Sequence, residues 1–162
     1  MVTPIAVREQ IGEAGAGVVR LLTPRLRGPA ARVSAYALLN AAARPNVTAV
    51  GREYGSRRAL ERAFRTASLP PPHRLVVLSR WLPVVEVAAA YAPPTGVLAQ
   101  ALGLSTGDVL YKAAIREIRI SPREFRRMTN LVRLLADIIT AYGSSICALP
   151  ESESGACRVL TD

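Results

Sequence analysis

The sequence is short of the residues that most often carry out catalysis or bind metals. Its one histidine, His73, directly follows three prolines at a predicted helix start, a position typical of a capping or surface residue. Its two cysteines, Cys147 and Cys157, have nine residues between them and no second pair or nearby histidine, so the spacing of a zinc site is absent. Gly15 and Gly17 do not make a nucleotide loop, because no strand pattern precedes them. We therefore expect that the protein is not an enzyme and holds no metal or cofactor.

Long hydrophobic runs are also missing. Half of the 162 residues are apolar, yet no apolar stretch approaches the roughly 20 residues that cross a bilayer. The first residues carry Glu9 and Glu13 and lack a continuous apolar stretch after a basic start, which does not fit a secretory signal. We expect a cytoplasmic protein with no membrane partner.

Lysine is almost absent, although the chain is strongly basic. Lys112 is the single lysine among 21 cationic residues, and the formal net charge is +9. A genome rich in G and C would explain the arginines by codon usage, whereas a polyanion partner would explain the charge itself. Position favours the second reading. Seven arginines lie between residues 51 and 80 and six cations between residues 112 and 127, while the only charges from 81 to 109 are Glu86 and Asp108.

Caps, turns and apolar periodicity divide the chain into helices, and no strand-like alternation appears, so the predicted fold is all-α. Residues 1–32, rich in Gly, Ala and Pro, indicate an N-terminal arm or linker with at most a short helix over 16–22. The helices predicted after it are Ala30–Ala43, Ala49–Tyr54, Arg57–Ala67, His73–Tyr91, Gly96–Leu102, Thr106–Arg119 and Arg123–Ile139. The predicted N-caps are Thr48, Ser56, Thr95 and Ser105.

Other residues have simpler predicted roles. Gly55 and Gly103 are expected to turn the chain between short helices, and Pro83 to kink or split the long one. From Tyr142 onward the composition indicates a mobile tail that includes both cysteines, as reduced thiols or, under oxidation, as a disulfide. The predicted core includes Leu60, Phe64, Trp81, Leu110 and Phe125.

One segment resembles a known family. GLSTGDVLYKAAIREIRISPREFRR, residues 103–127, is similar to the second helix-turn-helix of AraC/XylS transcription regulators. The positions that match this pattern are Gly103, Leu104 in place of the usual Phe, Ser105, Ser121, Pro122, Phe125 and Arg126. SRRALERAF, residues 56–64, resembles the recognition helix of the first unit through Leu60, Arg62 and Phe64. Pro72 and Arg80 fall where the family has the Pro and Arg of its central helix. The sequence departs from the pattern at Tyr54, Ala114 and Arg119.

The resemblance, which covers about three fifths of the chain, implies a fold. It implies two helix-turn-helix subdomains, built as homeodomain-like three-helix units and joined by a long central helix. The first would lie at about 48–67, the central helix at 73–91 and the second at about 95–119, within a DNA-binding domain over 33–128. Residues 129–162 would be a C-terminal helix extension and flexible tail.

The resemblance also implies a function. A bacterial, sequence-specific regulator of transcription would place both recognition helices in adjacent major grooves, roughly 34 Å apart, of double-stranded DNA. The residues expected to contact DNA in the first unit are Ser56, Arg57, Arg58, Glu61, Arg62 and Arg65. Those expected in the second unit are Ser105, Thr106, Asp108, Tyr111, Lys112 and Arg126.

Several alternatives stay open. A charged helix face is often only a solvated face, and Asp108 also suits the first turn of any helix. The rival interpretation is a helical protein-interaction domain of the same architecture that has lost DNA binding. RNA polymerase is a further candidate partner, and we expect a monomer or weak dimer. Either the regulator acts without a small-molecule signal, or the chain is a piece of a longer one.

Overall fold

The computed structural model describes residues 1–144, so the cysteines and most of the predicted tail lie outside the described residues. The described residues form eight α-helices and three short 3-10 helices, with no β-strand apart from one isolated bridge between Leu26 and Gly143. This confirms the all-α class. The α-helices are α1 (Pro4–Leu22), α2 (Gly28–Leu39), α3 (Val47–Glu53), α4 (Arg57–Thr66), α5 (Pro72–Tyr91), α6 (Thr95–Ala101), α7 (Gly107–Ile118) and α8 (Met128–Tyr142). None of these helices is both long and apolar enough to cross a membrane.

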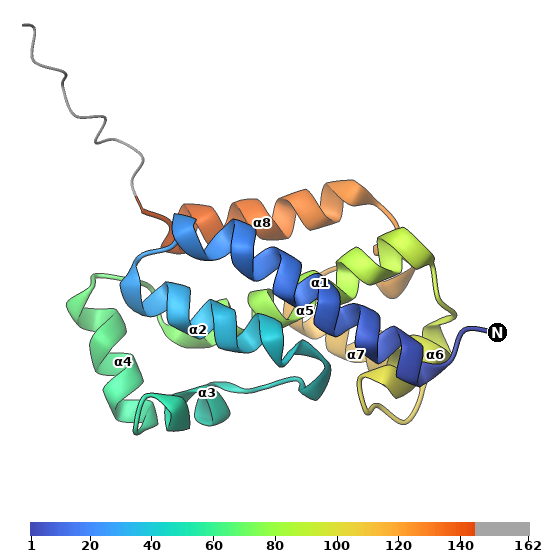
Figure 1. Ribbon diagram of the computed structural model, residues 1–162, viewed down its shortest axis with the longest axis horizontal. Coiled ribbons are helices and arrows are strands. Elements are labelled where there is room, and N and C mark those ends of the chain that lie inside the picture. Colours follow the sequence, from blue (N-terminus) through green and yellow to red (C-terminus); the bar gives the residue numbers. More distant parts are fainter. Residues whose placement is uncertain (145–162) are drawn as a thin grey trace, which may run out of the picture.

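Helix α5 is the centre of the molecule. It contacts α1, α2 and α8 along its length, and all three lie around it in Figure 1. The five side chains predicted for the core are all buried, and Trp81 packs on Phe125 with 5.8 Å between ring centroids. Pro83 lies inside α5, which continues past it to Tyr91 as one helix and is not split. A single apolar core therefore connects α1 to α8.

The prediction of an arm or linker over residues 1–32 was wrong. The segment forms α1, a 19-residue helix that buries Val7, Ile11, Val18 and Leu22 against α2, α5 and α6. The glycines that argued against a helix are explained at Gly15, where a Cβ atom would overlap the Leu38 carbonyl of α2. Close packing of two helices thus outweighs the low helix propensity of glycine here.

Three helix starts differ from the prediction. Asn46, not Thr48, caps α3, because its Oδ1 accepts a hydrogen bond from the Ala49 amide at 2.9 Å. Thr106, not Ser105, caps α7 and accepts from the Val109 amide at 3.3 Å. Helix α6 begins one residue early, so Thr95 is its first residue and no side chain caps it. Only the Ser56 cap of α4 is confirmed, at 3.0 Å from the Ala59 amide.

The end of the described chain is also better packed than predicted. Helix α8 runs to Tyr142, which was expected to begin the mobile tail but is buried. Its hydroxyl donates to the Pro71 carbonyl at 2.9 Å, and its ring meets Phe64 of α4 edge to face at 6.2 Å. The Arg27 amide donates to the Tyr142 carbonyl at 3.1 Å. Tyr142 therefore anchors α8 to α4 and to the start of α2.

Candidate nucleic-acid interface

Helices α3 and α4 form a pair joined by a tight turn. Gly55, with φ of +87°, makes the left-handed turn that was predicted for it. Ser56 then starts α4 by accepting a hydrogen bond in its first turn. A Cβ atom on Gly51 would lie 2.8 Å from the Arg57 Cα, so the two helices cross almost backbone to backbone. The two helices are therefore packed closely, and the Gly55 turn leads directly into the cap of α4.

The sequence of α4 separates its two faces. Leu60 and Phe64 are buried and attach the helix to the core. The predicted DNA-contacting residues of this unit all lie on the remaining surface. Ser56, Arg57, Arg58, Arg62 and Arg65 are exposed, and Glu61 is partly exposed. No other element covers this basic face within residues 1–144.

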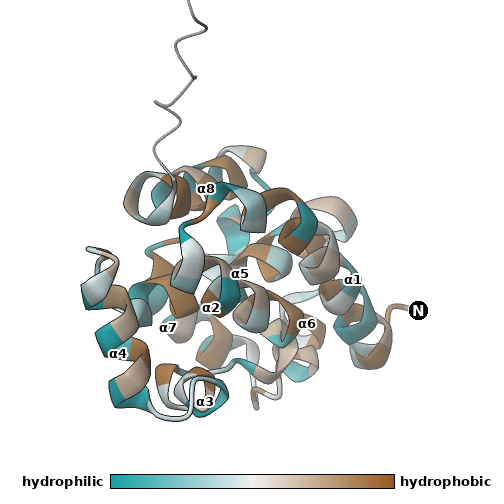
Figure 2. Ribbon diagram, turned by 60° about the vertical axis from the view of Figure 1, so that its left-hand side comes forward, coloured by the Kyte–Doolittle hydropathy of each residue, from teal (hydrophilic) through white to brown (hydrophobic). Residues whose placement is uncertain are grey.

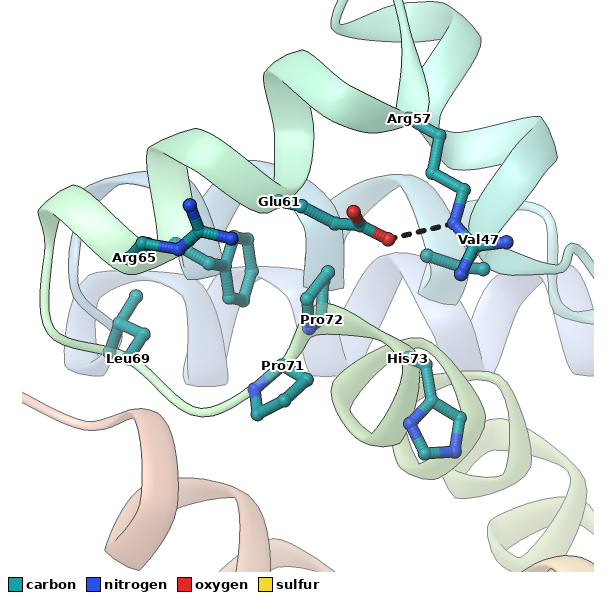
Figure 3. Close-up of a pocket in the computed structure, with 9 residues that line it drawn as sticks. Val47, Arg57, Glu61, Arg65, Leu69, Pro71, Pro72 and His73 are labelled. Carbon is teal, nitrogen blue, oxygen red and sulfur yellow. Dashed lines mark hydrogen bonds and ion pairs between the residues drawn. The ribbon is translucent and has the colours of Figure 1, made fainter.

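Part of that face borders a groove of about 440 Å³ between α4 and the start of α5. Arg57, Glu61 and Arg65 point from α4 toward Pro71, Pro72 and His73 (Figure 3). The Arg57 Nε donates to Glu61 Oε1 at 2.8 Å. Arg62 lies apart from these residues, in a shallower groove with Arg32 and Tyr54.

His73 lies beside α4, a neighbourhood that the sequence did not indicate. It was expected at a surface or capping position, and it is exposed at the start of α5. What the sequence could not show is that the loop over residues 67–71 folds this helix start back against α4. The groove therefore has arginine side chains on one wall and an imidazole on the other.

Helices α6 and α7 form the second pair. Gly103 makes the turn with φ of +68°, and the methyl group of Thr95 would lie 3.3 Å from a Cβ atom on Gly107. Five of the predicted contact residues are exposed here: Ser105, Thr106, Asp108, Tyr111 and Lys112. Arg126 is not on this pair. It follows the 3-10 helix Pro122–Glu124 and lines a small pocket beside Thr95.

The two departures from the family pattern in α7 have clear structural places. Ala114 is fully buried, so the helix packs closely where a larger side chain would need space. Arg119 ends α7 with φ of +58°, in the left-handed region that favours glycine. Both positions therefore serve the packing and the end of the helix, not its outer face.

A buried ionic cluster attaches α7 to α5. Glu117 Oε2 accepts from Arg80 at 2.6 Å and from the indole of Trp81 at 2.7 Å. Glu117 Oε1 accepts from Arg44 at 3.2 Å and from Arg116 at 3.1 Å. The Glu117 side chain is 11% exposed and that of Arg80 is 10% exposed. We call Glu117, Arg44, Arg80, Trp81 and Arg116 the Glu117 cluster.

The Glu117 cluster was missed by the sequence analysis, which gave Glu117 no role. Burial opposes ionisation of Glu117, but the hydrogen bonds from Arg80 and Trp81 outweigh it and lower the pKa of the carboxyl. The carboxylate therefore stays charged at neutral pH. Arg74 adds a bond from its guanidinium to the Glu117 carbonyl at 2.7 Å. These contacts attach the end of α7 to the first half of α5.

Helices α4 and α7 belong to two helix pairs that α5 separates along the chain. The α3–α4 pair precedes α5 in the chain and the α6–α7 pair follows it. Both α4 and α7 lie to the left of α1 in Figure 2, while α1 occupies the other side. No hydrogen bond or ion pair within residues 1–144 joins the predicted contact residues of α4 to those of α7. The structure thus presents two separate polar surfaces.

Comparison with known proteins adds no relative: no protein-family model, no curated protein and no solved structure matches this chain.

Proposed function

We propose that the protein binds double-stranded DNA through two helix-turn-helix units and regulates transcription. The observation that carries the proposal is that one arrangement occurs twice, once before α5 in the chain and once after it. In each pair a left-handed glycine turn is followed by a helix with a side-chain cap and an exposed polar face. Recognition helices of this motif enter the major groove with their first turns and outer faces.

The first unit would supply most of the affinity. Its exposed arginines can donate two hydrogen bonds each to phosphate oxygens or to a guanine edge. Arg57 is 59% exposed, and its contact with Glu61 is a surface ion pair worth only about 0.3–0.5 kcal/mol. A phosphate can therefore replace Glu61 as the partner of Arg57 at little cost. The amides that start α4, next to Ser56, add donors for a phosphate.

The second unit would offer fewer charged groups to DNA, but its second helix, α7, is held in one orientation against α5. Thr106, Asp108, Tyr111 and Lys112 offer hydroxyl, carboxylate and ammonium groups that suit base edges. The Glu117 cluster holds the helix that carries them against α5. Helix α5 continues through Pro83 as one helix, which supports a rigid connection between the two units. A match of their spacing to successive major grooves is part of the proposal.

The experiment is double charge reversal on α4, Arg57→Glu with Arg62→Glu, assayed by fluorescence anisotropy on duplex DNA over a range of salt concentrations. We expect binding to be lost at physiological salt. The slope of log affinity against log salt should fall by about two, one for each lost phosphate contact. Circular dichroism should remain unchanged, because neither side chain is buried.

The matched control is Arg20→Glu with Arg25→Glu, which changes the net charge equally on exposed residues of α1 and the turn after it. We expect this variant to keep most of the affinity. Equal losses in the two double variants would reduce the effect to net charge. Full affinity in the α4 variant would overturn the proposal and favour the protein-interaction alternative, which the exposed Val109 and Tyr111 of α7 also suit.

A further inference from the structure

A second groove lies on a part of the molecule that the proposed function does not use. It is formed between α8 and the C-terminal part of α1, which comes near α8 at the upper left of Figure 1, and it has a volume of about 430 Å³. Its walls are mostly aliphatic, from Val18, Leu21, Leu22, Leu131, Leu135 and Ile139. None of its lining residues belongs to α4 or α7, so a molecule bound here would not occupy the proposed DNA surface.

One acidic side chain, Glu86 of α5, lies among these aliphatic walls. Its Oε2 atom is buried and has no hydrogen-bond partner among the described residues. Burial also raises the pKa of this carboxyl. A buried acceptor without a donor is costly and uncommon in folded proteins. Glu86 is partly exposed as a residue, and its Oε2 is the buried atom for which residues 1–144 provide no partner.

The cation that lines the same groove does not satisfy Glu86. Arg25 follows α1, and its guanidinium donates instead to the Leu21 carbonyl. No ion pair to Glu86 is formed within the described part of the chain. The groove thus combines an apolar surface with one acidic acceptor, for which the described residues supply no donor.

We propose that the groove between α1 and α8 binds a small apolar amine, whose ammonium group donates to Glu86 and whose hydrocarbon body packs on Leu21, Leu135 and Ile139. The volume lies within the range of small-molecule pockets, about 300–1,000 Å³. A few placed polar groups in an apolar pocket are what orients a ligand. The proposal does not depend on DNA binding.

The surroundings favour a small molecule over a second protein surface. Leu21, which lines the groove, is 67% exposed, and any occupant of the groove has to cover it. A docked protein would also have to insert a hydrogen-bond donor as far as the buried oxygen of Glu86. A compact amine meets both requirements, because its charged group is at one end and its apolar body fills the rest.

The test uses the full chain and three probes that share a naphthylmethyl body and differ in their polar group: 1-naphthylmethylamine, 1-naphthylmethanol and the 1-naphthylacetate anion. Binding is followed by the shifts of backbone amides in NMR spectra at neutral pH. We expect the amine to bind about tenfold more tightly than the alcohol, because a charge-assisted hydrogen bond replaces a neutral one. The acetate should bind most weakly. The shifted amides should lie around Leu21, Glu86 and Leu135.

Two variants make the assignment specific. Glu86→Gln should reduce amine affinity about tenfold and leave the alcohol unchanged. Asp137→Asn removes the same charge from an exposed position of α8 outside the groove, and it should change neither affinity. The probe series in the wild-type protein decides the question even if the Glu86 variant does not fold.

Three outcomes would overturn the proposal. The first is equal affinity for the three probes, and the second is equal amine affinity in the wild-type and Glu86→Gln proteins. The third is concentration-dependent dimerisation that broadens the same amides without any probe, which would show that a second copy covers the groove. Each of these results leaves the proposed DNA binding untouched, because the two surfaces share no residue.

Discussion

The two helix pairs begin alike and are held differently. Each has a left-handed glycine in its turn and a hydroxyl side chain at the start of its second helix. Helix α4 is attached by Leu60 and Phe64 and carries its charges outward. Helix α7 is attached by small and aliphatic side chains and, in addition, by the buried carboxylate of Glu117. The same local motif therefore presents a charged surface in the first pair, whereas in the second pair its second helix is held against α5 by a buried ion pair.

The two pairs also differ in whether the arginines near them are exposed or buried. In the first pair Arg57 has a single surface partner, Glu61, which a phosphate can replace. Where the second pair attaches to the core, Arg80 of α5 and Arg44, which precedes α3, instead pair with Glu117 of α7 and are mostly buried. Basic residues that look equivalent along the sequence are thus divided into an exposed set, which we propose contacts DNA, and a buried set that attaches α7 to α5. Substitutions at matched residues of the two pairs test this division.

The largest expected effect is that of Glu117→Gln. The substitution keeps the shape of the side chain but leaves the guanidinium of Arg80 buried without a counter-charge. Loss of one partner of a buried ion pair costs about 3–5 kcal/mol. We expect the free energy of unfolding, measured in urea by circular dichroism, to fall by about 3 kcal/mol.

The matched substitution in the first pair is Glu61→Gln, which removes an exposed partner. It should change the free energy of unfolding by less than about 0.5 kcal/mol. Similar losses in both variants would contradict the division into a buried and a surface set. A stable Glu117→Gln protein would show that α7 does not need its ionic attachment.

The same cluster predicts how stability changes with pH. Because the pKa of Glu117 is lower in the folded protein than in the unfolded chain, its contribution is fully present above about pH 4.5. It is lost as the pH falls through the lowered value. The raised pKa of Glu86 acts in the opposite sense, since its contribution is present at low pH and lost as the pH rises. The difference in unfolding free energy between wild type and Glu117→Gln should therefore shrink below about pH 4.5.

Urea unfolding at several pH values measures that difference directly. The comparison with Glu117→Gln matters because other acidic groups titrate in the same range, including Glu124, whose pKa the bonds from Ser121 lower. A difference that stays constant down to the acid transition would show that Glu117 does not lose its charge-dependent contacts.

A smaller effect is expected from glycine substitutions at the two helix crossings. At Gly51 a methyl group would meet the backbone of Arg57 at 2.8 Å, so α3 and α4 would have to separate. We expect Gly51→Ala to cost about 1–3 kcal/mol, as other overpacked sites do. At Gly107 the nearest atom is a Thr95 methyl group at 3.3 Å, which can shift slightly. Gly107→Ala should therefore stay within about 0.5 kcal/mol of wild type.

Thermal unfolding of the two variants measures this contrast, and anisotropy on duplex DNA adds a second readout. Gly51→Ala should weaken binding as well as stability if α4 carries most of the contacts. A neutral Gly51→Ala would show that the two helices of the first pair are not held as closely as their crossing indicates.

How much of this the sequence could predict depends on how local each feature is. The Ser56 cap, the Gly55 turn and the apolar face of α4 involve neighbouring residues, and these predictions are confirmed. Helix α1 was missed because its glycines lower helix propensity, and the reason for Gly15 lies 23 residues away at Leu38. The buried residues of α1, from Val7 to Leu22, do follow helical spacing, but the glycine among them gives no apolar signal at its own position.

The candidate site shows the same limit. The exposed residues of α4 could be named from one amphipathic helix, because a charged face opposite Leu60 and Phe64 is a local pattern. The Glu117 cluster could not, since Arg44 and Glu117 are far apart in the chain and meet only when α5 and α7 pack. The position of His73 beside α4 depends likewise on a loop whose path the sequence does not specify.

The smallest expected effects come from the ends of the two second helices. Ser68 follows α4 with φ of +52° and Arg119 ends α7 with φ of +58°, and both conformations favour glycine. Ser68→Gly and Arg119→Gly should each raise the free energy of unfolding by up to about 1 kcal/mol, the relief of strain less the greater entropy of glycine in the unfolded chain. Thermal unfolding measures both, and DNA binding separates them. Only Arg119→Gly removes a cation, so only it should lower the salt slope, by about one, if the end of α7 lies near a phosphate. An unchanged slope would confine DNA contact in the second unit to the start of its helix and leave the first unit as the main source of affinity.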